Sequence, residues 1–330
     1  MTLALEPPIE AGAELDSDVP LVLSPGRTRA DRVFFAVLMA ASSIVLLAIG
    51  AILAFLISYS TSAVHYAGTS IITSQHFAAL GSKPKFGLYG VLVGTVMIAV
   101  LAVCVALPVS IAAALMINEY APRRARRALT AVIDLLAVLP SLLYGIWGLE
   151  VLNSEAYNIT VWMSHHADFI PLFREPDATY GHSIFLCGIV VGIMIIPIVT
   201  SVSREVMSQA PRDACEAALA LGGTKWGMVT DVILPFARNG ILGGVLLGLG
   251  RALGETVAVL LILSQTNLVH SHILGPGGGD IPALIANLFV QVPHLGKSAL
   301  TLAGLLLFAT ILVINFVARR IVGRPQVKIL

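Results

Sequence analysis

The chain has 330 residues, of which 57% are hydrophobic and 12% are charged, and its mean hydropathy is +0.90. Soluble domains contain about 25% charged residues, so this composition excludes an ordinary soluble protein and indicates a membrane protein. The net charge of +1 gives no reason to expect nucleic-acid binding.

Residues 1–30 differ from the rest of the chain because acidic residues and prolines are frequent there. Such a segment cannot bury enough apolar surface to fold, and we expect a disordered cytoplasmic tail. The apolar run from Val33 to about Ser58 is too long for the core of a signal peptide, and no small-residue cleavage site follows it. Residues 31–86 are therefore expected to form a retained first span and its outer loop.

A membrane-spanning helix needs about 20 apolar residues. Six segments meet this requirement: 33–58, 88–117, 129–152, 182–203, 239–265 and 298–318. Because backbone exposed to lipid must satisfy its own hydrogen bonds, all six are expected to be helical. The sequence therefore predicts an all-α integral membrane protein with six transmembrane helices.

Lysine and arginine are distributed unevenly among the segments that connect these spans. Fifteen of the 20 flank one face of the membrane, four flank the other, and Arg251 lies inside a span. Because basic residues accumulate on the cytoplasmic side, we expect both termini, including the tail 323–330, and the segment 204–237 in the cytoplasm. The connections on the outer side are then 59–87, 153–181 and 266–297.

The third outer connection contains a glycine run, Gly277 to Gly279, followed by a short apolar segment and a proline. This segment is too short to cross a bilayer, so we expect a helix that lies at or dips into the outer surface, with a flexible loop as the alternative. The glycine run is not a phosphate cradle, since no Walker motif accompanies it. No cysteine–histidine cluster is present either, and we expect no metal, cofactor or catalytic site in this chain.

The segment 204–237 has the features of two short helices separated by a turn. Pro211 suits the start of a first helix, and Gly222 with Gly223 would end it. Thr224 can cap a second helix, which we expect to close at Pro235. Such an exposed knob suits docking into the cleft of a partner protein. The alternative is an amphipathic segment lying on lipid, and the residues alone favour neither.

The same segment resembles the EAA loop of ABC importer permeases. The resemblance rests on Glu216-Ala217-Ala218, on Gly222 six residues after Glu216, and on Val232-Ile233-Leu234-Pro235. Isoleucine is commoner in the family where this chain has Val232. In that family the loop supplies a coupling helix that docks on an ATP-binding subunit. The coupling role is therefore expected here for Glu216, Ala217, Ala218, Gly222, Leu234 and Pro235.

The stretch GILGGVLLGLGRALGETVAVLL, residues 240–261, closely resembles the fifth-span region of phosphate permeases of the PstC type. Two earlier stretches, LPVSIAAALMINEYAP (107–122) and LPSLLYGIWG (139–148), are similar to that family as well. The resemblance covers about 87–150 and 182–318, and it implies a permease core at 87–322 with the bundle of a type I ABC importer.

That resemblance also implies a function and a set of partners. The chain would be the membrane subunit of an ATP-driven importer of inorganic phosphate in a bacterial cell membrane, and not itself an enzyme. Its partners would be a PstA-like second permease, two copies of an ATP-binding subunit and an extracytoplasmic phosphate-binding protein. ATP and Mg would be bound by the ATPase subunit.

Two charged residues, Arg251 and Glu255, lie within the fifth predicted span. In one continuous helix they would fall on the same face as the small residues Gly240, Gly244 and Gly248, which favours a position inside protein. Arg251 offers a planar donor fork that suits phosphate oxygens, and Glu255 would balance its charge when phosphate is absent. The alternative is a buried ion pair that only fixes helix packing.

Two further functions remain open from the residues. One is a permease of the same superfamily for another oxyanion, such as sulfate or molybdate, which the segment RALGET disfavours. The other is a self-contained secondary transporter, which would predict internal repeats with paired broken helices. No convincing repeat is present in the sequence.

Overall fold

The computed structural model describes residues 29–79, 84–167, 169–174, 181–269 and 272–322. Most of the predicted N-terminal tail and the tail 323–330 lie outside the described residues. The helices are α1 (Arg29–Ala67), α2 (Ser70–Thr73), α3 (Tyr89–Leu115), α4 (Arg123–Val138), α5 (Ser141–Trp147), α6 (Asn153–His166), α7 (Ile184–Ser208), α8 (Arg212–Ala220), α9 (Lys225–Met228), α10 (Leu234–Leu253), α11 (Val257–Ile262), α12 (Ile281–Leu288) and α13 (His294–Val322). Short helical segments are η1 (Met116–Tyr120), η2 (Gly148–Leu152), η3 (Pro171–Phe173) and η4 (Val229–Ile233), and the strands are β1 (Phe77–Ala78) and β2 (Lys85–Phe86).

The chain divides into two compact units, residues 1–52 and 53–330. The described part of the first is the beginning of α1, where the Ser42 and Ser43 hydroxyls donate to the carbonyls of Leu38 and Met39. This bonding satisfies both hydroxyls within an apolar helix. The second unit contains the end of α1 and every later element.

Five of the described helical segments are long and apolar enough to cross a membrane, and the bent pair Arg123–Val138 and Ser141–Glu155 gives a sixth if the two count as one span. The predicted all-helical architecture with six spans is confirmed on this count, with one small addition. The strands β1 and β2 pair antiparallel, Phe77 opposite Phe86, within the connection between the first two spans.

The third predicted span, 129–152, is not one straight helix. The chain bends by 92° between α4 and the helix that begins at Ser141. Pro140 has no backbone N–H, and it favours an extended Leu139, whose ψ is 134°. The Tyr144 hydroxyl donates to the Leu136 carbonyl at 3.0 Å and so joins the two sides of the break.

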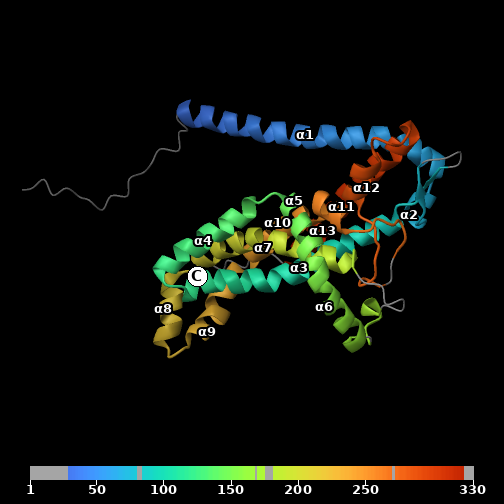
Figure 1. The fold of residues 1–330 in the computed structure, drawn as a ribbon. Coiled ribbons are helices and arrows are strands. Elements are labelled where there is room, and N and C mark those ends of the chain that lie inside the picture. Colours follow the sequence, from blue (N-terminus) through green and yellow to red (C-terminus); the bar gives the residue numbers. More distant parts are fainter. Residues whose placement is uncertain (1–28, 80–83, 168, 175–180, 270–271, 323–330) are drawn as a thin grey trace, which may run out of the picture. The chain divides into compact units, whose positions relative to one another are not determined.

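The centre of the second unit is formed by α3, α7 and α10, which run together in Figure 1. Glycines allow the helices to approach closely. A β-carbon at Gly192 of α7 would lie 3.0 Å from the Ala102 carbonyl oxygen of α3. On α10, Gly244 and Gly248 face Val199 and its neighbours on α7. The small-residue stripe of the fifth span therefore packs against protein, as the sequence predicts.

In the connection after α11, the described residues 272–293 include a short helix and bridged segments. Its short helix, α12, buries Ile281, Ala283 and Leu284. The residues before it form isolated bridges, among them Ser183 with Pro276 and Gln265 with Gly278. The predicted short helix in this connection is confirmed, and it packs on the start of α3 and on α13.

Candidate functional site: the loop 204–237 and the break in the fifth span

The turn after α8 is built on glycine. Gly222 has a φ of +86°, which side-chain-bearing residues rarely adopt. Its N–H donates to the Leu219 carbonyl at 3.0 Å, and the Gly223 N–H donates to the Ala218 carbonyl at 3.1 Å. These bonds satisfy carbonyls at the end of α8, and the predicted end of the first helix is confirmed.

The second helix begins as predicted but does not end where the sequence suggested. The Thr224 hydroxyl accepts a hydrogen bond from the Gly227 N–H at 3.0 Å and caps α9. The expectation that this helix closes at Pro235 is wrong, because the helical chain from Lys225 continues through η4 and α10 to Leu253. Pro235 is the second residue of α10 and directly follows the π-helical segment η4, so the N–H that it lacks falls at the junction of the two helical segments and does not end the helix. The knob is therefore directly continuous with the fifth span.

The tip of this loop carries apolar side chains that face solvent. Leu221 is 90% exposed and Trp226 is 59% exposed, and Glu216 and Ala217 on α8 are also exposed. Large apolar side chains grouped on an exposed turn are typical of surfaces that bind another molecule. Ala218 is half-buried, whereas Leu234 and Pro235 lie at the base of the loop on α10.

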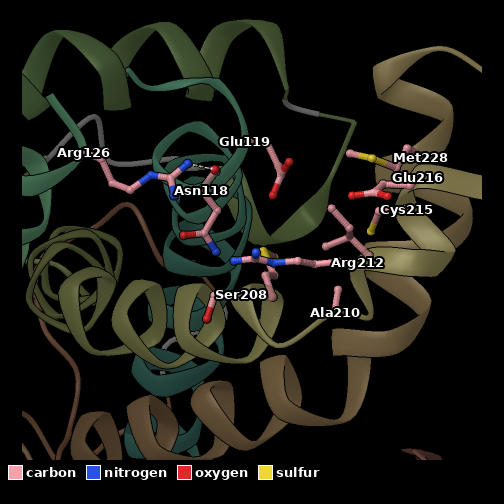
Figure 2. A pocket seen from close by; sticks show the side chains of 11 residues that line it. Asn118, Glu119, Arg126, Ser208, Ala210, Arg212, Cys215, Glu216 and Met228 are labelled. Carbon is pink, nitrogen blue, oxygen red and sulfur yellow. Dashed lines mark hydrogen bonds between the residues drawn. The ribbon is translucent and has the colours of Figure 1, made fainter. Parts of the chain in front are cut away.

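Behind the loop lies a cavity of about 330 Å³, which is shown in Figure 2. Its polar lining comes from η1, α4, α7 and α8: Asn118 and Glu119, Arg126, Ser208, and Arg212 with Glu216. Figure 2 shows the Arg212 side chain extending from α8 toward Asn118. The cavity is therefore lined both by the loop and by the segment that follows α3.

Side-chain contacts hold this segment against the loop. The Lys225 ammonium donates to the Glu119 carbonyl and lies 4.7 Å from the centre of the Tyr120 ring. The Asn118 amide donates to the Arg204 carbonyl on α7 at 2.7 Å. The sequence did not indicate a role for Asn118, Glu119 or Tyr120. Their partners lie more than 80 positions away, and contacts between such distant residues leave no periodic pattern in the sequence.

Cys215 of α8 lines the same cavity. Burial raises the pKa of its thiol, and the nearby carboxylates of Glu119 and Glu216 raise it further. A thiol held in the protonated form is a poor nucleophile, so the environment of Cys215 does not activate it.

Arg251 lies half-buried in the last turn of α10. Its neighbours Gly248 and Ala252 are buried, so the guanidinium leaves the helix beside a face that packs on protein. The last carbonyl groups of α10 form the negative end of the helix dipole, which favours a cation such as the Arg251 guanidinium in this turn. A planar, permanently charged donor is thus placed where a regular helix stops.

The predicted placement of Glu255 one helical turn from Arg251 is wrong, because α10 ends at Leu253 and α11 begins only at Val257. In the part of the chain that the structure describes, Glu255 does not form an ion pair with Arg251. Its Oε1 instead accepts a hydrogen bond from the Ala258 N–H at 3.2 Å, at the start of α11. The carboxylate is 7% exposed, so it stabilises a helix start in a nearly dry setting.

A second buried carboxyl, Asp280, belongs to the same region and was not predicted from the sequence. It is 2% exposed, and its Oδ2 accepts a hydrogen bond from the Ala283 N–H at 3.0 Å at the start of α12. Burial raises the pKa of Asp280 to about 7; hydrogen bonds from Ala283 and Thr95 oppose this shift, and the charge of Glu255 adds to it. The sequence signal that could have identified Asp280 is its place two residues before Pro282, at the start of a short apolar helix.

Comparison with known proteins places the chain within a described family. The family model for the inner membrane component of binding-protein-dependent transport systems matches residues 106–326. The phosphate transport system permease protein PstC of Mycobacterium leprae is 40% identical over 258 residues, which cover 77% of this chain and 81% of that protein. PstC 2 of Mycobacterium tuberculosis is 36% identical over 309 residues, which cover 92% of this chain and 95% of that protein.

A solved structure shares the fold. A chain of a bacterial alginate ABC transporter, crystallised with its pentasaccharide-bound periplasmic protein, matches with a TM-score of 0.55 at 18% identity. The match covers 89% of this chain and 96% of that one. At this identity the likeness concerns the arrangement of helices and not the transported molecule.

Proposed function

The chain belongs to the family of inner membrane components of binding-protein-dependent transport systems, and from this we propose that it is the permease subunit of an ATP-driven importer of inorganic phosphate. It is a multi-pass membrane protein that performs no catalysis of its own. The observation that carries the choice of phosphate is the 36–40% identity, over most of the chain, to permeases named for phosphate transport.

The transported anion would pass Arg251. A guanidinium presents two parallel N–H donors to two oxygens of phosphate, and it keeps its charge at every physiological pH. Removing an arginine from water at this depth costs about 2.5–3.5 kcal/mol on insertion scales, so its presence in a span favours a role in transport. The alternative, a purely structural ion pair with Glu255, loses support because Glu255 bonds to the Ala258 amide instead.

Glu255 would limit how tightly phosphate is held. A fixed carboxylate near the path repels a bound anion and lowers its affinity, and an importer must release what it binds. The position of Glu255 at the break between α10 and α11 places this charge in a segment where the backbone is not committed to a regular helix. Broken helices of this kind line substrate paths in many transporters.

Coupling to ATP hydrolysis would occur through the cytoplasmic loop. The exposed residues Leu221 and Trp226 offer apolar surface for an ATP-binding subunit, and Glu216, Ala217 and Ala218 form the helix beside them. Because Lys225–Leu253 is one continuous helical segment, a displacement of the loop would be transmitted along the helix to Arg251. The ATP and Mg would be bound by that partner, in two copies, together with a PstA-like permease and a phosphate-binding protein.

The assignment is tested by reconstitution. The complete transporter, with its ATPase subunits and binding protein, is placed in liposomes, and uptake of labelled phosphate is measured beside sulfate and molybdate. We expect phosphate uptake that requires ATP and the binding protein. ATP-dependent uptake of sulfate or molybdate without phosphate would reassign the substrate. Phosphate uptake without ATP would indicate a secondary transporter.

A further inference from the structure

Asp280 lies where three parts of the fold meet on the outer side of the bundle. Its own carboxylate caps α12 through the Ala283 N–H. The next residue, Ile281, donates its N–H to the Thr95 hydroxyl of α3 at 2.9 Å. The Asp280 carbonyl accepts a hydrogen bond from the Gln265 amide at 3.1 Å, in the segment that follows α11. The residue therefore joins α3, α12 and the chain leaving the fifth span.

The charges around this position are unbalanced. Glu255 is the charged group of the described chain that acts on the Asp280 carboxyl, and it is also an acid. The other groups packed near it are the Thr95 hydroxyl, the Gln265 amide and the Cys187 thiol of α7. None of these carries a compensating positive charge. Two buried carboxylates would then repel each other, and one of them is better held with a proton.

We propose that Asp280 is a positioning residue of the translocation path that carries a proton in the working protein, so that the buried carboxyls of Asp280 and Glu255 hold one negative charge between them. This inference rests on the proposed place of Glu255 on the phosphate path. With Asp280 neutral, the outer connection stays fastened to α3 beside Glu255. When Asp280 loses its proton, a second buried negative charge opposes both that packing and an approaching anion.

The direction of the pH effect follows from the pKa of about 7 for Asp280. Below pH 7 the group is mostly neutral, and above it the group is mostly charged. An asparagine at this position can still accept the Ala283 N–H and cap α12 equally well, but it never gains charge. The exchange Asp280→Asn therefore separates capping from protonation.

The test measures initial phosphate uptake by the reconstituted transporter between about pH 6 and pH 8. The phosphate ions themselves change ionisation in this range, so the informative quantity is the ratio of Asp280→Asn to wild-type uptake at each pH. We expect a ratio near one at pH 6 that rises about tenfold by pH 8, since the neutral fraction of the wild-type carboxyl falls about tenfold per pH unit above its pKa. A ratio that stays constant with pH would overturn the proposal.

A matched control removes packing without changing the contacts of the titrating carboxyl. Gln265→Leu loses the amide that donates to the Asp280 main-chain carbonyl at 3.1 Å, while the Asp280 carboxyl keeps its own hydrogen bonds. It is expected to lower uptake by a similar factor at every pH between about 6 and 8. If the ratio of Gln265→Leu to wild-type uptake rose with pH as expected for Asp280→Asn, local packing, and not the Asp280 proton, would set the response.

Infrared spectroscopy gives a readout that does not depend on transport. The purified complex at pH 6 should show a protonated carboxylic acid C=O band that is absent in Asp280→Asn. If Asp280→Asn does not fold, Glu255→Gln serves instead: removing the neighbouring charge should shift the loss of the band to lower pH. A band that does not respond to either substitution would overturn the proposal.

The two proposals can fail separately. If the wild-type transporter did not import phosphate, the proposed function would be rejected, but the infrared titration would still decide whether Asp280 carries a proton.

Discussion

The carbonyl oxygen of Gly279 lies where a side chain on Gly94 would begin: a β-carbon at Gly94 would be 2.0 Å from that oxygen. The start of α3 and the glycine run before α12 are thus in direct backbone contact. The contact explains why position 94 is glycine, and a β-carbon on Gly279 would in turn lie 2.5 Å from the Val91 side chain of α3. Two residues beyond Gly279, the Ile281 N–H donates to the Thr95 hydroxyl of the same helix.

Gly94→Ala should therefore destabilise the protein. The added carbon meets backbone and not a flexible side chain, so one of the two segments must move, and we expect a loss of about 3 kcal/mol, at the upper end for overpacking. Thermal denaturation of the purified complex measures it. Gly243→Ala on α10, where nothing lies within 4 Å, is the control and should be neutral or slightly stabilising. Equal stability of the two variants would contradict the Gly94–Gly279 contact.

Substitutions at Gly222 should uncouple ATP hydrolysis from uptake. A β-carbon there meets nothing within 4 Å, so the effect comes from the positive φ alone and should be about 1–2 kcal/mol for Gly222→Val. Asparagine tolerates this conformation, and Gly222→Asn should keep most coupling. The measurement is phosphate imported per ATP hydrolysed, with membrane content of the chain as a check.

Glu216→Lys should lower the same ratio by reversing the charge of an exposed residue on α8. If Gly222→Val and Glu216→Lys both transport normally while the ATPase subunit no longer copurifies, the docking role of the loop is wrong.

Arg251→Gln should abolish phosphate uptake without preventing assembly of the complex. Arg251→Lys should also fail largely, because a point charge cannot present the same donor fork. Arg238→Gln, at an exposed position near the other end of α10, is the control and should retain uptake. Uptake of labelled phosphate and copurification of the subunits measure the two properties.

The exchange Arg251→Glu with Glu255→Arg distinguishes a positional role from simple charge balance. We expect this double variant to assemble but not to transport, because the cation moves from the end of α10 into the break before α11. Robust transport by the double variant would rule out a specific position for Arg251. Glu255→Gln alone should hold phosphate longer and slow turnover more than it weakens capture.

The orientation in the membrane is predicted from charge and can be measured by labelling. Single cysteines replace Leu221, which is 90% exposed, or Phe169, which is 81% exposed, in a chain lacking its three natural cysteines. An impermeant thiol reagent added to intact cells should modify Phe169→Cys and spare Leu221→Cys. The opposite pattern would place the loop and both termini outside.

The sequence by itself determined the membrane class, the number of spans, the glycine end of α8 and the Thr224 cap. These features depend on local composition and on backbone preferences that act over a few residues. The predicted permease core at 87–322 and the role of the coupling loop rest on resemblance, whereas the tail limits rest on composition and the roles of Arg251 and Glu255 on their chemistry; all of them remain predictions. The outer edges of these limits lie partly outside the described residues.

The tertiary structure alone decided where the helices break and what meets at the breaks. At Leu139-Pro140 the predicted straight span is instead a pair of helices bent by 92°. Because α10 ends at Leu253, Glu255 is not one helical turn from Arg251 as expected. The helical pattern of apolar residues in the sequence continues through such a break, because hydropathy carries no information on backbone direction. The charge of Glu255 acts on Asp280, and Lys225 donates to the Glu119 carbonyl; these groups are distant in sequence, and only packing in three dimensions brings them near one another.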